Sequence, residues 1–217
     1  MNLTTFIVVI VGWVFSLCLH EFSHALVAYF GGDTTVKDKG YLTFNPLKYT
    51  HPVYSLLLPL LFLVMGGIGL PGGAVYIETW RLRSRGWISA VSLAGPTSNL
   101  ILAILLGLLL SFSPVTSNGL WPGLAFLAFL QVSAVVLNLI PLPPFDGFGV
   151  VEPYLPNNIR MTLAQTQGIL AWVVFFLLWY VPAFNNLFWS SISFITQLAG
   201  VPLQLAALGY NLFRFWG

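Results

Sequence analysis

Hydrophobic residues run through this chain in long stretches that short polar segments interrupt. A helix needs about 20 predominantly apolar residues to cross the hydrocarbon core of a bilayer. The clear stretches of this kind cover residues 3–30, 88–111, 119–140, 164–182 and 186–203. The pattern therefore predicts an all-α polytopic membrane protein with about five transmembrane helices.

Two features complicate this picture. Residues 53–70 are apolar, but Pro59 and several glycines break the stretch, so we interpret it as a re-entrant segment. Residues 40–45 read as a short strand closed by a turn, and residues 73–77 also carry strand-forming side chains. We therefore expect a small membrane-associated β element beside the helices.

Composition narrows the class of protein. The 217 residues are 58% hydrophobic and only 6% charged, which leaves no stretch for a water-soluble appendage. We expect a single membrane-embedded domain over residues 1–217, with a core at about 3–155 and additional C-terminal helices at 164–217. The net charge of +2 is small and its basic residues are scattered, so no nucleic-acid partner is expected. The start lacks the basic region of a signal peptide, so the first stretch is expected to remain as a span.

The first apolar stretch contains the sequence His20-Glu21-Phe22-Ser23-His24, an HExxH motif. On a helix, side chains four residues apart lie on one face, so the two imidazoles can bind one metal ion while Glu21 lies beside them. Zinc bound in this way activates a water molecule, and a neighbouring carboxylate can take the proton of that water. The motif therefore predicts a zinc hydrolase.

Coincidence explains the motif poorly. With three His and three Glu in the chain, random order would produce HExxH roughly once in two thousand chains of this composition. Ionisable side chains inside a membrane span also cost several kcal/mol unless they are paired or bind a metal.

A catalytic zinc ion usually takes three protein ligands, so one ligand is missing from the motif. The third histidine of the metzincins is absent, because Val27 and Phe30 occupy the positions of that motif. The remaining candidates are Asp33, Asp38, His51, Glu78, Asp146 and Glu152. Asp146 is the best of them, since it lies between prolines and Gly147 at the end of a span. An interfacial Asp that caps the next helix remains an equal alternative on spacing alone.

At this point the chain resembles the site-2 protease family of intramembrane zinc metalloproteases. The resemblance rests on His20 to His24, on Ala-Gly-Pro at 94–96 followed by Asn99, and on Asn138-x-x-Pro followed by Asp146-Gly147. It implies one Zn²⁺ per chain, with His20, His24 and Asp146 as ligands, and Glu21 as general base. It also implies that Asn138 orients the substrate or the site.

The resemblance extends to residues 42–48, which look like the compact branch of the family that lacks a PDZ domain. Two positions depart from the family pattern, Phe145 before the Asp-Gly pair and His51 where an Asp is common, and neither is a proposed ligand. The implied partner is a single-span membrane protein substrate in the lipid bilayer, and a homo-oligomer is also possible.

The site constrains the topology. If residues 53–70 re-enter the membrane, the HExxH motif and Asp146 approach the same face. All eight basic residues would then lie on that face, namely Lys37, Lys39, Lys48, Arg81, Arg83, Arg85, Arg160 and Arg214. The positive-inside rule makes this face cytoplasmic. We therefore expect a multi-pass protein of a prokaryotic plasma membrane, with its N-terminus outside and its site towards the cytoplasm.

Three other functions are compatible with parts of the pattern. A membrane zinc peptidase that acts on soluble or lipidated peptides would use a Glu as third ligand, for which Glu152 is the one marginal choice. A zinc-binding transporter would need further polar residues along its spans. A non-proteolytic homologue would not need His20, Glu21, His24 and Asp146 together.

Overall fold

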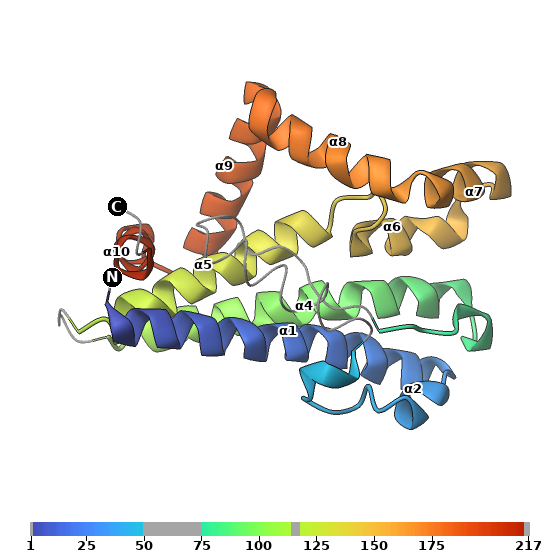
Figure 1. Ribbon diagram of the computed structural model, residues 1–217, viewed down its shortest axis with the longest axis horizontal. Coiled ribbons are helices and arrows are strands. Elements are labelled where there is room, and N and C mark those ends of the chain that lie inside the picture. The colour runs from blue at the N-terminus through green and yellow to red at the C-terminus, as the bar shows by residue number, and fades with distance from the viewer. Residues whose placement is uncertain (1, 50–74, 114–117, 215–217) are drawn as a thin grey trace.

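The computed structural model describes residues 2–49, 75–113 and 118–214. Its centre is a bundle of three helices that lie side by side in Figure 1. By length and composition, each of the three could cross a membrane. They are α1 (Leu3–Gly31), α4 (Arg85–Leu110) and α5 (Leu120–Asn138). This bundle matches the first three clear spans that the sequence predicts.

The directions of the three helices follow from contacts at their ends. The Thr5 hydroxyl donates to the carbonyl of Gly119 over 2.8 Å, which joins the N-terminal ends of α1 and α5. At the other end, the amide of Arg83 donates to the carbonyl of Gly31 over 2.9 Å. Helices α1 and α5 therefore run parallel, and α4 runs antiparallel to both.

The bundle is closely packed on its inner side and apolar on its outer side. Gly12 of α1 leaves room for the side chain of Leu127 from α5, and Trp13 and Leu17 are buried beside them. The outward faces of α1 and α4 expose large aliphatic and aromatic side chains such as Phe15 and Leu105. Helices that are apolar all round are typical of a lipid environment.

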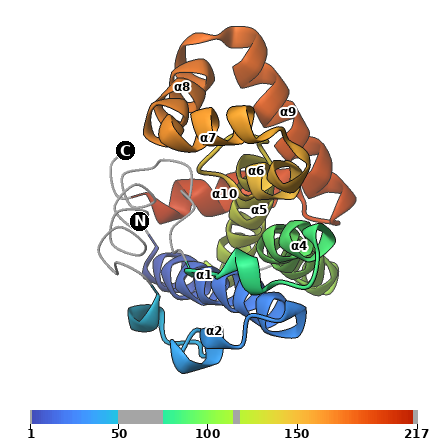
Figure 2. The same ribbon diagram turned by 90° about the vertical axis from the view of Figure 1, so that its right-hand side faces the viewer.

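Short elements gather at the end of the bundle where α1 stops and α4 starts (Figures 1 and 2). They are α2 (Thr35–Asp38), η1 (Pro46–Lys48), η3 (Thr79–Arg81), α6 (Asp146–Val151), η4 (Glu152–Tyr154) and α7 (Asn157–Gln165). Gly32, with a φ of 123°, ends α1 in a conformation that favours glycine, and the chain turns there.

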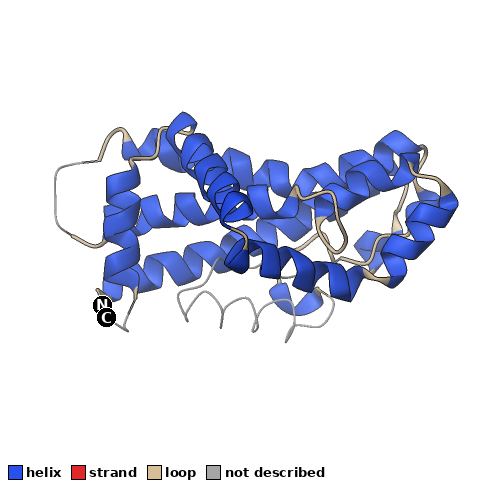
Figure 3. Ribbon diagram, turned by 90° about the horizontal axis from the view of Figure 1, so that it is seen from above, coloured by secondary structure: helices blue, strands red, loops and turns tan. Residues whose placement is uncertain are grey.

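Of the C-terminal helices, two lie on one side of the bundle and the last lies across the bundle end where α1 begins (Figures 1 and 3). They are α8 (Gln167–Tyr180), α9 (Pro182–Leu198) and α10 (Leu203–Phe213). The chain bends by 74° between α7 and α8 and by 114° between α9 and α10. The described residues therefore hold three candidate spans, or up to five if each bent pair counts as one.

The prediction of a small β element is wrong for the described part of the chain. No strand occurs among the described residues, and residues 40–45 form bends in which Thr43 donates to the carbonyl of Gly40. Residues 75–77 belong to no helix or strand, and the amide of Val75 bonds to a side chain of α1 and not to a neighbouring strand. The predicted re-entrant segment at 53–70 lies outside the described residues.

The position of Arg214 also differs from the prediction. The amide of Asn2 donates to the carbonyl of Leu212 over 2.7 Å, and the rings of Phe6 and Phe213 stack at 5.4 Å. The C-terminal end of α10 thus lies beside the start of α1, at the opposite end of the bundle from α2 and η3. The bend after α9 places Arg214 at this end, because it turns α10 across the end of the bundle.

Candidate metal centre

Helix α1 carries the HExxH residues into the bundle interior. His20, Glu21 and His24 are each at most 6% exposed and lie in the second half of the helix. Because His20 and His24 are four residues apart, their rings lie one above the other on the face that α4 covers. The edges of the two rings meet at 3.0 Å between their Nε2 atoms.

Asp146 reaches the same place from the far end of α5. After Asn138 the chain turns through its proline-rich segment, and α6 begins at Asp146. Gly147 lies directly against the carbonyls of Leu139 and Ile140, so a side chain there would collide with the backbone. The Asp-Gly pair therefore lets α6 start close enough to α5 for Asp146 to enter the bundle.

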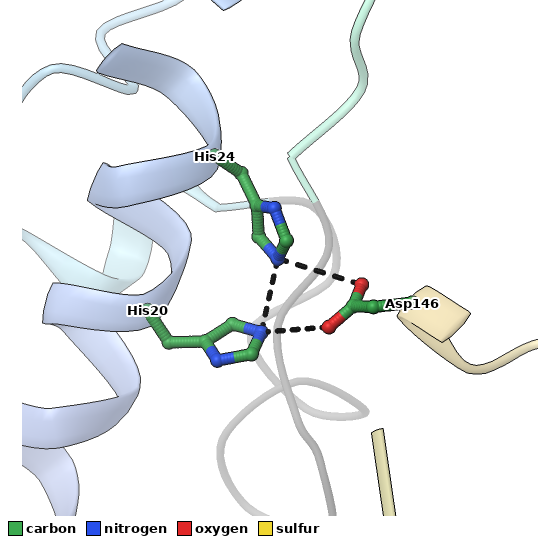
Figure 4. A group of neighbouring side chains, drawn as sticks. All are labelled: His20, His24 and Asp146. Atoms are coloured by element: carbon green, nitrogen blue, oxygen red, sulfur yellow. Dashed lines mark hydrogen bonds and ion pairs between the residues drawn. The ribbon is translucent and has the colours of Figure 1, made fainter. Parts of the chain in front are cut away.

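The three side chains converge on one point, as Figure 4 shows. The Oδ2 atom of Asp146 lies 3.1 Å from Nε2 of His20, and its Oδ1 lies 3.4 Å from Nε2 of His24. One potential ligand atom from each residue lies within 4.8 Å of the others. Asp146 Oδ2 is buried, and its polar neighbour is Nε2 of His20. Lone pairs of three residues that turn towards one point at such short distances are the arrangement that a metal ion satisfies.

Helix α4 fixes this arrangement from the opposite side. Nδ1 of His24 lies 2.6 Å from the carbonyl of Val91, which places the ring proton on Nδ1 and leaves Nε2 free to bind a metal. One turn further, Gly95 faces both rings, and a methyl group at this position would collide with the Nε2 atoms of His20 and His24. The glycine keeps open the space around the convergence point.

The residues present fit zinc. Two imidazole nitrogens and one carboxylate oxygen form a known ligand set for catalytic zinc, which leaves a fourth position for water or substrate. A cavity of about 240 Å³ opens beside the ligand atoms and supplies this space. It is lined by His20, Glu21, His24, Asn138 and Asp146, together with Pro144, five apolar residues between Val75 and Val91, and the polar residues Thr79 and Ser92.

Glu21 is held by the segment that precedes α4. One carboxylate oxygen, Oε2, accepts a hydrogen bond of 3.1 Å from the amide of Val75. Further along this segment, the amide of Glu78 donates to the buried carboxylate of Asp33 over 2.8 Å. Residues 75–83, which we call the strap, therefore line one side of the cavity and are tied to the end of α1.

Charged side chains hold the strap at its middle. Glu78 accepts hydrogen bonds from Arg81 and from Lys39, the latter at 2.9 Å. These hydrogen bonds lower the pKa of the Glu78 carboxyl below its ordinary value, and the bond from Arg81 has the largest effect. Glu78 is therefore ionised at neutral pH. The strap is thus fixed by ion pairs that lie outside the cavity.

The structure also separates the candidates for the third ligand. Asp33 bonds to Thr35 and to the strap, Glu78 pairs with Lys39 and Arg81, and Glu152 pairs with Arg160 at 3.8 Å. Asp38 is not part of the group, and His51 lies outside the described residues. The capping alternative for Asp146 is not supported, because Phe145 is the N-cap residue of α6 and the Asp146 side chain turns towards the histidines.

Sequence reasoning missed three partners of the site. Val91 and Val75 act through backbone atoms, for which the side chain gives no signal. Gly95 was part of a recognised motif, yet a glycine in a helix could equally serve helix packing. Asn138, which was expected at the site, is 3% exposed and lines the cavity from the end of α5.

Comparison with known proteins gives several close relatives. The chain is 49% identical over 214 residues to the proposed zinc metalloprotease Rip2 of Mycolicibacterium smegmatis, covering 97% of this chain and 81% of that protein. The Rip2 protein of Mycobacterium tuberculosis is 47% identical over 213 residues, with the same coverage. The proposed zinc metalloprotease YwhC of Bacillus subtilis is 32% identical over 188 residues, covering 81% of each chain. No family model and no solved structure matches the chain.

Proposed function

The chain belongs to the site-2 protease family of zinc metalloproteases, and we propose that it hydrolyses a peptide bond inside the membrane-spanning segment of another protein. The observation that carries this proposal is the convergence of His20, His24 and Asp146 inside a bundle of lipid-compatible helices. A ligand set buried among such helices favours a substrate that is itself within the membrane.

His20, His24 and Asp146 would hold one Zn²⁺ through Nε2, Nε2 and a carboxylate oxygen. When bound, zinc supplies Lewis acidity, which lowers the pKa of a water molecule and polarises a peptide carbonyl. The names of the relatives support zinc as the metal, since each is called a zinc metalloprotease.

Glu21 is the general base in this proposal. Its Oε2 atom is fixed by the Val75 amide, so the other oxygen remains to take a proton from the attacking water. The same carboxyl group then returns the proton to the nitrogen of the departing amine, which completes hydrolysis. Asn138 lies in the cavity wall, where its amide can donate to or accept from the substrate backbone.

The substrate must lose its helical hydrogen bonds before its carbonyl reaches the site. Val75 and Ile77 line the cavity outside any helix, and the backbone of residues 75–77 could pair with an unwound substrate segment. Backbone pairing of this kind is largely independent of side chains. We therefore expect substrates to be selected by how readily their helix unwinds.

We propose that the metal centre lies towards the cytoplasm. Seven of the eight basic residues fall on segments at the end of the bundle where α1 stops, and Arg214 alone follows α10 at the other end. The positive-inside rule assigns the first end to the cytoplasm. Labelling of single cysteines at positions 45 and 83 from opposite faces of the membrane would refute this orientation.

The proposed function is tested by incubating purified protein in detergent with a panel of single-span membrane proteins. We expect cleavage within the span of at least one substrate. Cleavage should be lost in Glu21→Gln, which keeps its metal, and after treatment with a zinc chelator. Cleavage only outside the spans, or cleavage that survives both treatments, would contradict the proposal.

A further inference from the structure

The two histidines of the metal centre differ in the partner of their second ring nitrogen. Nδ1 of His24 is held by the carbonyl of Val91 at 2.6 Å. Nδ1 of His20 is buried and has no hydrogen-bond partner among the described residues. Figure 4 shows this nitrogen on the side of the ring away from His24 and Asp146, towards the N-terminal part of α1.

A buried ring nitrogen of this kind needs a partner. If Nε2 of His20 faces a metal, the ring is neutral and the proton resides on Nδ1. Leaving a buried donor without a partner is unfavourable, because the group has lost its hydrogen bonds to water. Histidines that bind metals almost always donate this proton to a carboxylate, a carbonyl or a water molecule, which sets the orientation of the ring.

Asn99 of α4 offers the missing acceptor. Its side chain is 5% exposed, and its Oδ1 atom is buried with no partner in the described part of the chain. It follows Gly95 by four residues and so lies on the same face of α4, one turn deeper. Gly95 itself lies against Nε2 and Cε1 of His20, and Cε1 is bonded to Nδ1.

The tilt of helical side chains brings the two groups together. Side chains lean towards the N-terminal end of their own helix. Because α1 and α4 are antiparallel, the side chains of His20 and Asn99 lean towards each other. The donor on His20 and the acceptor on Asn99 thus each lack the kind of partner that the other offers.

Gln131 of α5 is the other buried side-chain amide with an unpartnered oxygen in the described residues. Leu127 packs against Gly12, so Gln131, one turn later, lies at the level of Ser16. Helix α5 runs parallel to α1, and its side chains lean away from the metal centre. Gln131 is therefore a fitting control and not the partner.

We propose that Asn99 is a positioning residue for the metal ligand His20, because its Oδ1 atom accepts the Nδ1–H of His20 through one bridging water molecule. The inference rests on the proposed function, in which His20 binds zinc. It gives each histidine an acceptor from α4, the Val91 carbonyl for His24 and the Asn99 amide for His20.

The test measures metal binding by purified full-length protein in detergent, with cobalt(II) as a spectroscopic probe and a chromophoric chelator as competitor. Asn99→Leu, which keeps the shape but removes the acceptor, should weaken metal affinity by about 10–100-fold and alter the visible absorption of bound cobalt. Asn99→Asp keeps an acceptor and should retain the affinity and spectrum of the wild type. Gln131→Met should leave both unchanged.

The outcomes separate the two proposals. If the wild type binds no metal, the proposed function fails and this inference fails with it. If the wild type binds one metal and Asn99→Leu shows the same affinity and spectrum, only the role of Asn99 is refuted. Equal losses in Asn99→Leu, Asn99→Asp and Gln131→Met would also refute it, because they would indicate a general effect of core packing. A melting temperature for each metal-free variant identifies any that fails to fold.

Discussion

Gly95 of α4 lies in contact with the imidazole of His20, close enough that no side chain fits between the helix and the ring. The metal centre therefore depends on a position that contributes no chemical group. The Ala-Gly-Pro sequence that includes Gly95 thus has a spatial role, since it lets α4 approach both histidines.

Gly95→Ala should lower metal affinity by about tenfold to a hundredfold, because the added methyl group pushes the two Nε2 atoms apart and core overpacking costs about 1–3 kcal/mol. Competition with a chelator measures this affinity. Gly86→Ala is the matched control in the same helix, since its methyl group meets only Ser84 at 3.7 Å. Equal affinities of Gly95→Ala and the wild type would contradict the described packing.

Asp146→Ala should bind well below one equivalent of zinc, since only two protein ligands remain. Zinc content after gel filtration, measured by mass spectrometry, checks this result. Glu152→Ala is the control, because Glu152 is the other acid that could be the third ligand. We expect this variant to retain one equivalent of zinc. The reverse pattern would identify Glu152 as the ligand.

Gly147→Ala should reduce both zinc content and stability. Its methyl group would collide with the carbonyls of Leu139 and Ile140, so α6 must shift and carry Asp146 away from the histidines. Gly168→Ala meets nothing within 4 Å and serves as control. Thermal unfolding of the metal-free and zinc-bound forms separates the two effects, because loss of Asp146 reduces the stabilisation by zinc. Unchanged stabilisation by zinc would show that α6 does not position the ligand.

Glu78→Gln should loosen the strap in a manner that depends on pH. The folded pKa of Glu78 lies below its ordinary value of 4.5, so its ion pairs stabilise the fold above about pH 4.5 and cease to do so as pH falls through the folded pKa. The difference in melting temperature between wild type and Glu78→Gln should thus be constant near neutrality and shrink below pH 4.5. Glu152→Gln, whose pair with Arg160 is longer at 3.8 Å, should show a smaller difference. A difference that grows on acidification would contradict the predicted sign.

The sequence predicts those parts of the site that depend on local periodicity. His20, Glu21 and His24 follow from helical spacing alone, and the long apolar stretches predict α1, α4 and α5 with small errors at their ends. Asp146 could be chosen from six candidates only through a combination of turn residues and family resemblance. Its side chain meets the histidines only because α6 starts against the carbonyls after α5.

The remaining features depend on partners that a sequence does not reveal. Strand-forming residues at 75–77 do not form a strand, because β structure requires a neighbouring strand and the amide of Val75 bonds to Glu21. The Val91 carbonyl holds His24 through a backbone atom that every residue possesses. Arg214 was placed on the wrong end because the angle of 114° after α9 was not foreseen.

The ligands of the metal centre lie on the first long helix and beyond the last helix of the central bundle, and this has a consequence for biogenesis. A ribosome delivers His20 and His24 to the membrane long before it has synthesised Asp146. Until α4 and α5 are inserted and α6 has turned back, a nascent chain offers only a two-ligand site, which retains metal weakly. The three-ligand site therefore forms only once α6 has been synthesised and has turned back against α5, while α8, α9 and α10 still follow in the chain.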